Sequence, residues 1–407
     1  MRGLTAFDRH LSATSPAPLA VAFSGGGDSL ALLLMTRAWA DAHGRRVVAL
    51  TVDHGLNPAS GDWTEQCRKT AERLGVGFAA LYWTGDKPKT GLPAAARAAR
   101  HALLADAARA AGAHVLLMGH TADDLMEAAA MRADGSTVPD PRAWSPSPAW
   151  PQGRGLFILR PLLETRRAEL REWLTTRGET WIDDPANSKF ARGRARTLIS
   201  AHPDESRGPG LFRGPSAVKD LGPDFRRDER WGVIRLPRSS EDRAVAAAAL
   251  CAGGTTRPPR GDRLAKLMAQ QPPFTATLAG ARIEADGAVV TFLRDAGETG
   301  RGGLQPLRLT PHEPAVWDGR FEITADQPLL VTPLKGRAAH LPPAEQQALK
   351  AIPAAARPAL PALVDNAGHV HCPVLAAAPI VRCRSLVVER FTAAVGLIGK
   401  EADLAAK

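Results

Sequence analysis

Short apolar runs alternate with longer stretches of helical character through residues 19–178, and this alternation limits the possible folds more than any other feature. An apolar run at 19–23 precedes a helical stretch at 29–44. The further predicted strands are 46–55, 77–83, 114–120 and 155–160, and the further predicted helices are 57–75, 92–112, 121–132 and 164–178. Elements in this order predict an α/β fold with a doubly wound parallel sheet. Ligands of such sheets bind beyond the carboxyl ends of the strands.

The alternation stops near residue 200, where the chain becomes rich in Pro, Gly and Ser. Two helical stretches at 240–254 and 260–270 then precede alternating strands within 274–295, which predicts a small α+β module. Beyond residue 301 the chain is rich in Pro, with short predicted strands that include 321–334 and 384–395. We therefore expect three domains, at 1–200, 201–300 and 301–407, the last of which would supply contacts to a nucleic-acid partner.

The formal net charge of +10 favours a polyanionic partner such as nucleic acid, although a solvated basic surface is the alternative. The four cysteines are scattered and form no CxxC motif, which is typical of a reducing compartment. No apolar stretch approaches the roughly 18 residues of a membrane-spanning helix. These features predict a soluble cytoplasmic protein without a membrane partner.

The stretch "FSGGGDSL" at 23–30 joins the first predicted strand to its helix. Its small and hydroxyl-bearing residues are Ser24, Gly25, Gly26, Gly27, Asp28 and Ser29. Bare backbone at a helix N-terminus lets N–H groups converge on a phosphate, and the Asp28 carboxylate suits a Mg²⁺ ion shared with that phosphate. The stretch lacks the Lys of GxxxxGK[ST] and the spacing of GxGxxG. The alternative is a glycine turn whose aspartate caps the helix.

Two more polar clusters follow predicted strands. Asp53 ends the second strand, where it would contact a nucleotide or cap a turn. Asp123, Asp124 and Glu127 follow the fourth strand, and Asp123 and Glu127 are spaced to share one helix face. These carboxylates would bind an amine and accept its proton, or they form the ordinary acidic first turn of a helix.

Arginines supply the candidate phosphate and RNA contacts. Arg100, with Arg97 one turn before it, would reach a phosphate or belong to a solvated helix face. Arg192, Arg194 and Arg196 follow the turn "DDPAN" and suit an RNA backbone, with a solvated basic segment as the alternative.

The loop at 24–29 resembles the signature of the PP-loop ATP pyrophosphatases, which cleave ATP between the α- and β-phosphates. Further segments narrow the resemblance, namely "VDHGLNPASGDWTEQCRKTAERLGV", "AARAARHALL", "GHTADDLME", "LRPLLETRRAELREWL" and "WIDDPANSKFARGRAR". Together they are similar to the tRNA(Ile)-lysidine synthetase family over about residues 18–200. The resemblance implies that ATP, Mg²⁺ and free lysine convert the wobble cytidine of a CAU-anticodon tRNA(Ile) to lysidine. It implies catalytic roles for Asp28, Arg100, Asp123, Asp124 and Glu127.

The chain departs from the family pattern at several positions. Leu125 stands where Gln is usual, His101 where Tyr is usual, Gly193 where Asn is usual, and 133–154 replaces a glycine-rich stretch. Two alternatives are a tRNA 2-thiolation enzyme, which would need paired cysteines whereas Cys67 stands alone in the N-terminal half, and a non-catalytic adenine-nucleotide-binding module. The sequence leaves open which carboxylate contacts the lysine amine and whether the protein forms a homodimer.

Overall fold

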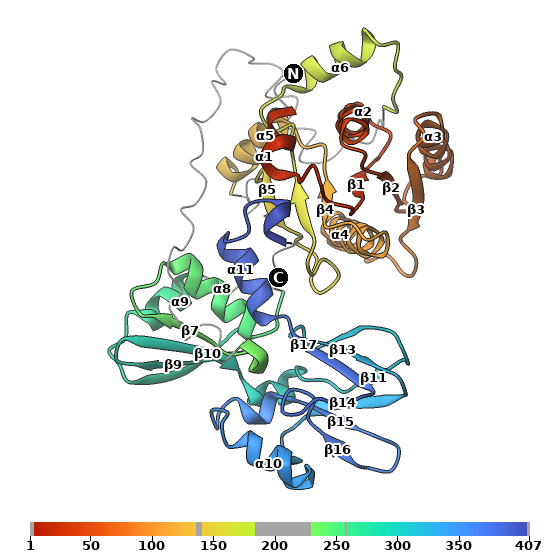
Figure 1. Cartoon of the computed structure of the whole chain (residues 1–407). Coiled ribbons are helices and arrows are strands. Elements are labelled where there is room, and N and C mark those ends of the chain that lie inside the picture. Colours follow the sequence, from red (N-terminus) through yellow and green to blue (C-terminus); the bar gives the residue numbers. More distant parts are fainter. Residues whose placement is uncertain (1–3, 136–140, 184–228, 257–258, 260, 405–407) are drawn as a thin grey trace. The chain divides into compact units, whose positions relative to one another are not determined.

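The computed structural model describes residues 4–135, 141–183, 229–256, 259 and 261–404. The chain divides into two compact units. The first comprises Met1–Gly214 together with Ile398–Lys407, and the second comprises Pro215–Leu397. Figure 1 labels the elements of both. The predicted boundary near residue 200 lies outside the described residues, so the division into three domains stays a prediction.

The first unit is built on a six-stranded sheet with the order β3-β2-β1-β4-β6-β5. Its strands are β1 (Leu19–Ala22), β2 (Val47–Asp53), β3 (Gly77–Tyr82), β4 (Val115–Leu117), β5 (Trp144–Pro146) and β6 (Phe157–Leu159). The first four and β6 run parallel, whereas β5 pairs with β6 in the antiparallel direction. The predicted α/β class is confirmed. The edge strand β5 lies within 133–154, the segment that departs from the family pattern and for which no strand was predicted.

Helices cover both faces of this sheet (Figure 1). They are α1 (Leu4–His10), α2 (Gly27–Ala42), α3 (Ser60–Arg73), α4 (Leu92–Ala110), α5 (Ala122–Ala133) and α6 (Arg167–Thr175). Alternate strand residues point to opposite faces. Leu19 and Val21 pack in one apolar cluster with residues of α2, α3 and α6, while Ala20 packs in another with residues of α4. The strands are therefore buried on both sides, which explains their continuous apolar runs.

The strand order reverses between β1 and β4. From β1 the chain proceeds through β2 to β3 at one side, and β4, β6 and β5 follow at the other side. The two central strands lie in register, with Leu19 beside Val115 and Val21 beside Leu117. The loops that follow β1 and β4 are therefore neighbours at the switch point, which is the usual ligand-binding position of open α/β sheets.

The second unit contains three small antiparallel sheets. The first has the order β7-β10-β9-β8, with β7 (Ile234–Pro237), β8 (Phe274–Leu278), β9 (Ala281–Asp286) and β10 (Val289–Arg294). Helices α8 (Asp242–Ala252), α9 (Gly261–Met268) and α11 (Val387–Val395) belong to this part. Residues of β7, β9, β10, α8 and α11 share one apolar cluster. The predicted α+β module is confirmed here.

The other two sheets of the second unit have the orders β11-β14-β15-β16 and β12-β13-β17. Their elements are β11 (Leu307–Leu309), β12 (Ala315–Trp317), β13 (Phe321–Ala325), β14 (Leu329–Pro333), α10 (Pro343–Leu349), β15 (Pro361–Val364), β16 (Val370–His371) and β17 (Val381–Ser385). The prediction of a strand over 384–395 is wrong for most of its length, because α11 begins at Val387. Val387, Phe391 and Val395 are all buried, and their spacing of four is that of a helix.

Among the described residues, no helix is long and apolar enough to cross a membrane.

Candidate active site

The phosphate-loop candidate, residues 24–29, connects β1 to the first turn of α2. The Ser29 hydroxyl donates to the Gly26 carbonyl at 2.8 Å, and the Ser24 backbone N–H donates to Ser29 Oγ at 3.2 Å. These bonds fold the loop against the helix N-terminus, where backbone N–H groups and the helix dipole favour an anion. The loop therefore has the position that the sequence predicted for it.

The backbone at Gly25 favours glycine, because its φ of +80° lies in the left-handed region. A Cβ atom there would also lie 2.4 Å from Ile182 Cδ1, so that side chain would have to move. A second close approach occurs at Gly119, after β4, where a Cβ atom would lie 3.0 Å from the Asp28 carbonyl oxygen. The two loops at the switch point thus pack backbone against backbone.

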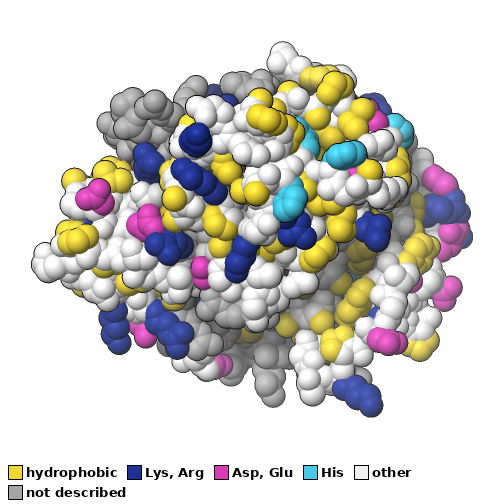
Figure 2. All heavy atoms as spheres, turned by 90° about the horizontal axis from the view of Figure 1, so that it is seen from below, with side chains coloured by type: hydrophobic (Ala, Val, Ile, Leu, Met, Phe, Trp, Pro, Cys, Tyr) yellow, Lys and Arg dark blue, Asp and Glu magenta, His cyan; other side chains and the backbone are white. Residues whose placement is uncertain are grey.

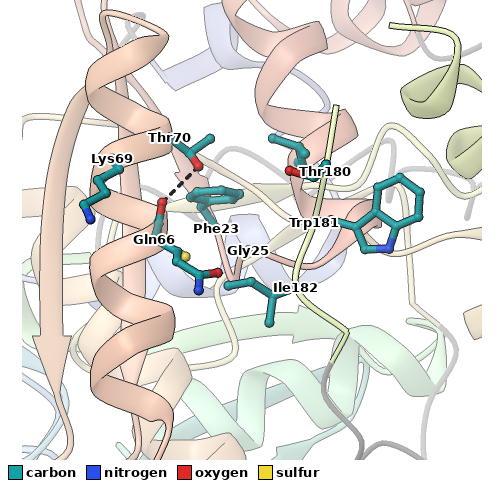
Figure 3. A pocket seen from close by; sticks show the side chains of 10 residues that line it. Phe23, Gly25, Gln66, Lys69, Thr70, Thr180, Trp181 and Ile182 are labelled. Carbon is teal, nitrogen blue, oxygen red and sulfur yellow. Dashed lines mark hydrogen bonds between the residues drawn. The ribbon is translucent and has the colours of Figure 1, made fainter. Parts of the chain in front are cut away.

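A cavity of about 280 Å³ lies beside the phosphate loop. Figure 3 shows Gln66, Lys69 and Thr70 of α3 on one side and Thr180, Trp181 and Ile182 on the other. The Ile182 backbone N–H donates to the Gly25 carbonyl at 2.9 Å, so the segment 180–182 is bound directly to the loop. This segment forms one wall of the site, and its residues Trp181 and Ile182 begin the stretch "WIDDPANSKFARGRAR", which is part of the family resemblance.

Arg167, at the start of α6, is the centre of the carboxylate cluster. Its Nε donates to Asp28 Oδ2 at 2.9 Å, and its Nη1 donates to Glu127 Oε1 at 3.3 Å. Its Nη2 lies 3.6 Å from Asp124 Oδ2, and its backbone N–H donates to Asp123 Oδ2 at 2.7 Å. The structure therefore brings together all four acidic residues that the sequence singled out at the first and fourth strand ends.

The carboxylates of this cluster differ in their electrostatics. Burial raises the pKa of Asp28, against the opposing effect of the Arg167 guanidinium. Burial acts on Asp124 in the same sense, but His120, the hydrogen bonds from Thr121 and the charge of Arg167 together lower the pKa of Asp124. Burial also disfavours the charge of Arg167, yet its bond to Asp28 and the surrounding carboxylates raise the pKa of the guanidinium.

Asp124 also has a structural task. Its Oδ2 accepts from the Thr121 backbone N–H at 2.8 Å and from the Thr121 hydroxyl at 2.9 Å, which forms a capping box at the start of α5. Asp124 thus has, at least in part, the structural role that the sequence left open as an alternative, that of an acidic residue in the first turn of a helix. Glu127, whose side chain is only 2% exposed, lies one turn further along α5 and takes no part in this cap.

Arg167 is the functional candidate that the sequence interpretation missed. It lies in the segment "ETRRAEL" after β6, at the same edge of the sheet as the other candidates. The rule that used carboxyl ends of strands to find Asp28 and Asp123 applies equally to the strand before Arg167. The available signal was a charged residue in the first turn of the helix that follows that strand.

A second cluster is basic and lies on the α4 side of the sheet. It consists of Arg97, Arg100 and His101 from α4, His120 after β4 and Arg160 after β6, and we call it the basic cluster. His101 is 5% exposed, and neither of its ring nitrogens has a hydrogen-bond partner within the part of the chain that the structure describes. Burial, followed by the charges of Arg100 and Arg97, lowers the pKa of His101 to about 3.

Burial and neighbouring positive charges also lower the pKa of Arg160 and His120. Burial and the neighbouring Arg97 and Arg100 lower the pKa of Arg160 to about 10. Burial and Arg160 lower the pKa of His120 to about 3, while Asp124 acts in the opposite direction. His120 therefore lies between the acidic and the basic cluster. Such a concentration of positive charge would be relieved by a bound anion.

The remaining predicted residues are less informative. Asp53 ends β2, and its Oδ1 accepts from the Gly55 backbone N–H at 2.7 Å, as in the predicted turn cap. Its nucleotide contact stays a prediction. Arg192, Arg194 and Arg196 lie outside the described residues, so their predicted contact with RNA also stays a prediction.

Known proteins are similar to this chain along nearly its whole length. A family of PP-loop domains matches residues 4–202. The tRNA(Ile)-lysidine synthase of Caulobacter vibrioides is 52% identical over 412 residues and is covered to 97%, as is this chain. That of Hyphomonas neptunium is 37% identical over 72% of this chain and 86% of its own length. Among solved structures, a U34-tRNA thiolase from Methanococcus maripaludis with a 4Fe-4S cluster matches 50% of this chain and 73% of its own, with a TM-score of 0.41 and 15% identity.

Proposed function

The chain belongs to the tRNA(Ile)-lysidine synthase family, and on this premise we propose that it joins free lysine to C2 of the wobble cytidine of a CAU-anticodon tRNA(Ile). ATP is consumed, and AMP and pyrophosphate are released. The observation that carries the proposal is the bridge between the two candidate sites, in which Arg167 contacts Asp28 at 2.9 Å and Glu127 at 3.3 Å. A phosphate loop adjoining ammonium-binding carboxylates suits a reaction between ATP, a base and an amine.

In the first step the cytosine O2 attacks the α-phosphorus of ATP, the bond to the β-phosphate oxygen breaks, and pyrophosphate leaves. The loop at 24–29 binds the phosphates through its N–H groups and hydroxyls. Asp28 offers a hard carboxylate oxygen, the kind of ligand that Mg²⁺ prefers, so it would hold the ion together with phosphate oxygens. When bound, Mg²⁺ would neutralise part of the phosphate charge.

In the second step the lysine ε-amine attacks C2, the bond from C2 to O2 breaks, and AMP leaves with that oxygen. The ammonium, with a reference pKa of ~10.4, must first lose a proton. Asp123 and Glu127 are the better proton acceptors in this proposal, because the Asp124 carboxylate is already held in the helix cap. The lysine ammonium competes with the Arg167 guanidinium for the same oxygens.

Arginines complete the proposal on the RNA side. Arg100 belongs to the basic cluster and would bind a phosphate of ATP or of the tRNA backbone. Arg192, Arg194 and Arg196 would bind the tRNA backbone. A cytoplasmic location and a homodimer are further parts of this proposal. The two alternatives, a thiolation enzyme and a non-catalytic nucleotide-binding module, are not favoured, because relatives that match 97% and 72% of this chain are named lysidine synthases.

Pyrophosphate release from ATP and Mg²⁺ with a CAU-anticodon tRNA(Ile) transcript tests the phosphate loop. We expect Asp28→Asn to slow the release by about 10²-fold or more, because the carboxylate that would hold the Mg²⁺ ion at the phosphates is lost. The matched control is Asp41→Asn on the same helix, where the side chain is 64% exposed and pairs with Arg37 at 3.3 Å. Equal rates for Asp28→Asn and the unmodified protein would contradict the assignment of this site.

A further inference from the structure

The last described residues of the chain return to the first unit. We call residues 398–404 the C-terminal clasp; they include the short 3₁₀ helix Glu401–Leu404. The Glu401 carboxylate accepts from Arg45 Nη1 at 2.7 Å and Arg45 Nη2 at 2.8 Å, and each of the two side chains is 2% exposed. The Ser12 backbone N–H also donates to Glu401, at 2.9 Å. Residues at opposite ends of the sequence thus form one buried ion pair.

The surroundings of this ion pair satisfy its polar atoms. Arg45 donates further bonds to the Ser12 carbonyl at 2.9 Å and the Ala17 carbonyl at 2.6 Å. A buried charge pair is tolerated when its geometry is good and its remaining hydrogens find acceptors, and removing one partner then leaves an uncompensated charge. Docking of the clasp is therefore specific to Glu401, rather than a general apolar contact.

The clasp also contacts the edge strand β5. The Trp144 indole N–H donates to the Ile398 carbonyl at 3.0 Å. His10, whose Nδ1 lies 2.9 Å from the Gly399 carbonyl, stacks on the Trp144 ring with centroids 5.3 Å apart. On the other side, Trp144 stacks on Phe157 of β6 at 5.0 Å. The indole thus stacks on His10 of α1 and Phe157 of β6, while its N–H binds the clasp.

The strand β5 and the residues before it hold Arg160 of the basic cluster. The Arg160 backbone N–H donates to the Ala143 carbonyl at 2.8 Å. Its Nη1 donates to the Arg142 carbonyl at 2.8 Å and to the Ser145 hydroxyl at 3.1 Å. The path from Glu401 to Arg160 consists of contacts within the first unit, through Ile398, Trp144 and the backbone of β5.

From this path we propose that the C-terminal clasp is a positioning element of the active site. Its docking fixes β5, and β5 sets the place of Arg160 and so the shape of the basic cluster. Glu401 and Trp144 are positioning residues in this proposal, since they act through Arg160 and touch no substrate. The effect on catalysis rests on the proposed function, whereas the effect on β5 does not.

Hydrogen–deuterium exchange of the full-length protein tests the positioning directly. We expect Trp144→Phe to speed exchange in 142–160 with little change at 24–40. This substitution keeps an aromatic ring at the position but removes the indole N–H that binds the Ile398 carbonyl. We expect Glu401→Gln to speed the same exchange more strongly, because it weakens the buried ion pair with Arg45. Lys400→Ala is the matched control, because this clasp side chain is exposed.

Pyrophosphate release provides the second readout. For Glu401→Gln we expect a loss of about tenfold in kcat with tRNA, from misplacement of Arg160, with the KM for ATP unchanged. If Glu401→Gln does not fold, Trp144→Phe decides by the same readouts. Unchanged exchange in 142–160 in both Trp144→Phe and folded Glu401→Gln would overturn the proposal. No release by the unmodified protein would instead refute the proposed function and leave the exchange result valid.

Discussion

A single guanidinium organises the acidic side of the site. Arg167 contacts Asp28, Asp124 and Glu127 through its three side-chain nitrogens, at 2.9 to 3.6 Å. Its own side chain is 17% exposed and that of Glu127 is 2% exposed, so little water screens the pair. The charges of the cluster are mutually dependent, and the loss of Arg167 leaves carboxylates facing one another.

We expect Arg167→Ala to lower the free energy of unfolding by about 3 kcal/mol, because Glu127 then remains buried without its cation. Urea unfolding at neutral pH measures this change. The matched control is the neighbouring Arg166→Ala, since the Arg166 side chain is 39% exposed and pairs with Asp123 at 3.3 Å. Such an exposed pair contributes less than about 1 kcal/mol. Equal stabilities of the two variants would contradict the central position of Arg167.

At the scale of secondary-structure elements, α4 and the ends of β4 and β6 together bury two histidines in their neutral form. The folded-state pKa of His101, about 3, lies below the value of about 6.5 for an unfolded histidine. The unfolded chain therefore binds more protons as the pH falls below 6.5. Stability is fully present above that pH and is lost progressively toward the folded-state pKa.

For His101 this linkage removes about 2 kcal/mol of stability between pH 7 and pH 5. We expect His101→Asn, which does not titrate, to shrink the difference between urea unfolding at the two pH values by that amount. His114→Asn is the control, because His114 is exposed and outside the basic cluster. A pH difference that is as large in His101→Asn as in the unmodified protein would show that His101 is not buried as a neutral group.

The pattern of apolar residues along the sequence predicted most strands of the first sheet. It did not predict the elements whose structure depends on tertiary contacts. Apolar runs fully buried between two helical layers were recognisable from sequence, as at 19–23. The edge strand β5 carries the partly buried Trp144, Ser145 and Pro146, so it has no strand pattern of its own. For 384–395 the apolar residues are ambiguous between strand and helix, and the burial of Phe391 at a spacing of four from Val387 reveals the helix.

The candidate site was predictable to a similar extent. Asp28 and Asp123 follow strands directly, so the geometry of parallel sheets brings them together from sequence alone. To predict that Arg167 reaches these carboxylates, one must also know that β6 is the neighbour of β4 in the sheet. The pairing of Arg45 with Glu401 joins positions 356 residues apart, and nothing local distinguishes Glu401 from an exposed charge in a polar tail.

At the scale of the whole molecule, the second unit is inserted into the first. In sequence, the second unit, Pro215–Leu397, separates the two parts of the first unit, and the clasp belongs to the second of these parts. The net charge of +10 does not by itself locate an RNA surface. Figure 2 shows one face on which Lys and Arg are spread among acidic and apolar side chains rather than gathered in one patch.

The most direct test of the account is mass spectrometry of nucleosides from a CAU-anticodon tRNA(Ile) transcript after incubation with the protein, ATP, Mg²⁺ and isotope-labelled lysine. We predict that the cytidine at the wobble position gains the mass of the labelled lysine less one water, since C2 loses its oxygen to AMP. The same transcript with a UAU anticodon is the control. An unmodified wobble cytidine, with ATP and lysine present and the protein folded, would contradict the account.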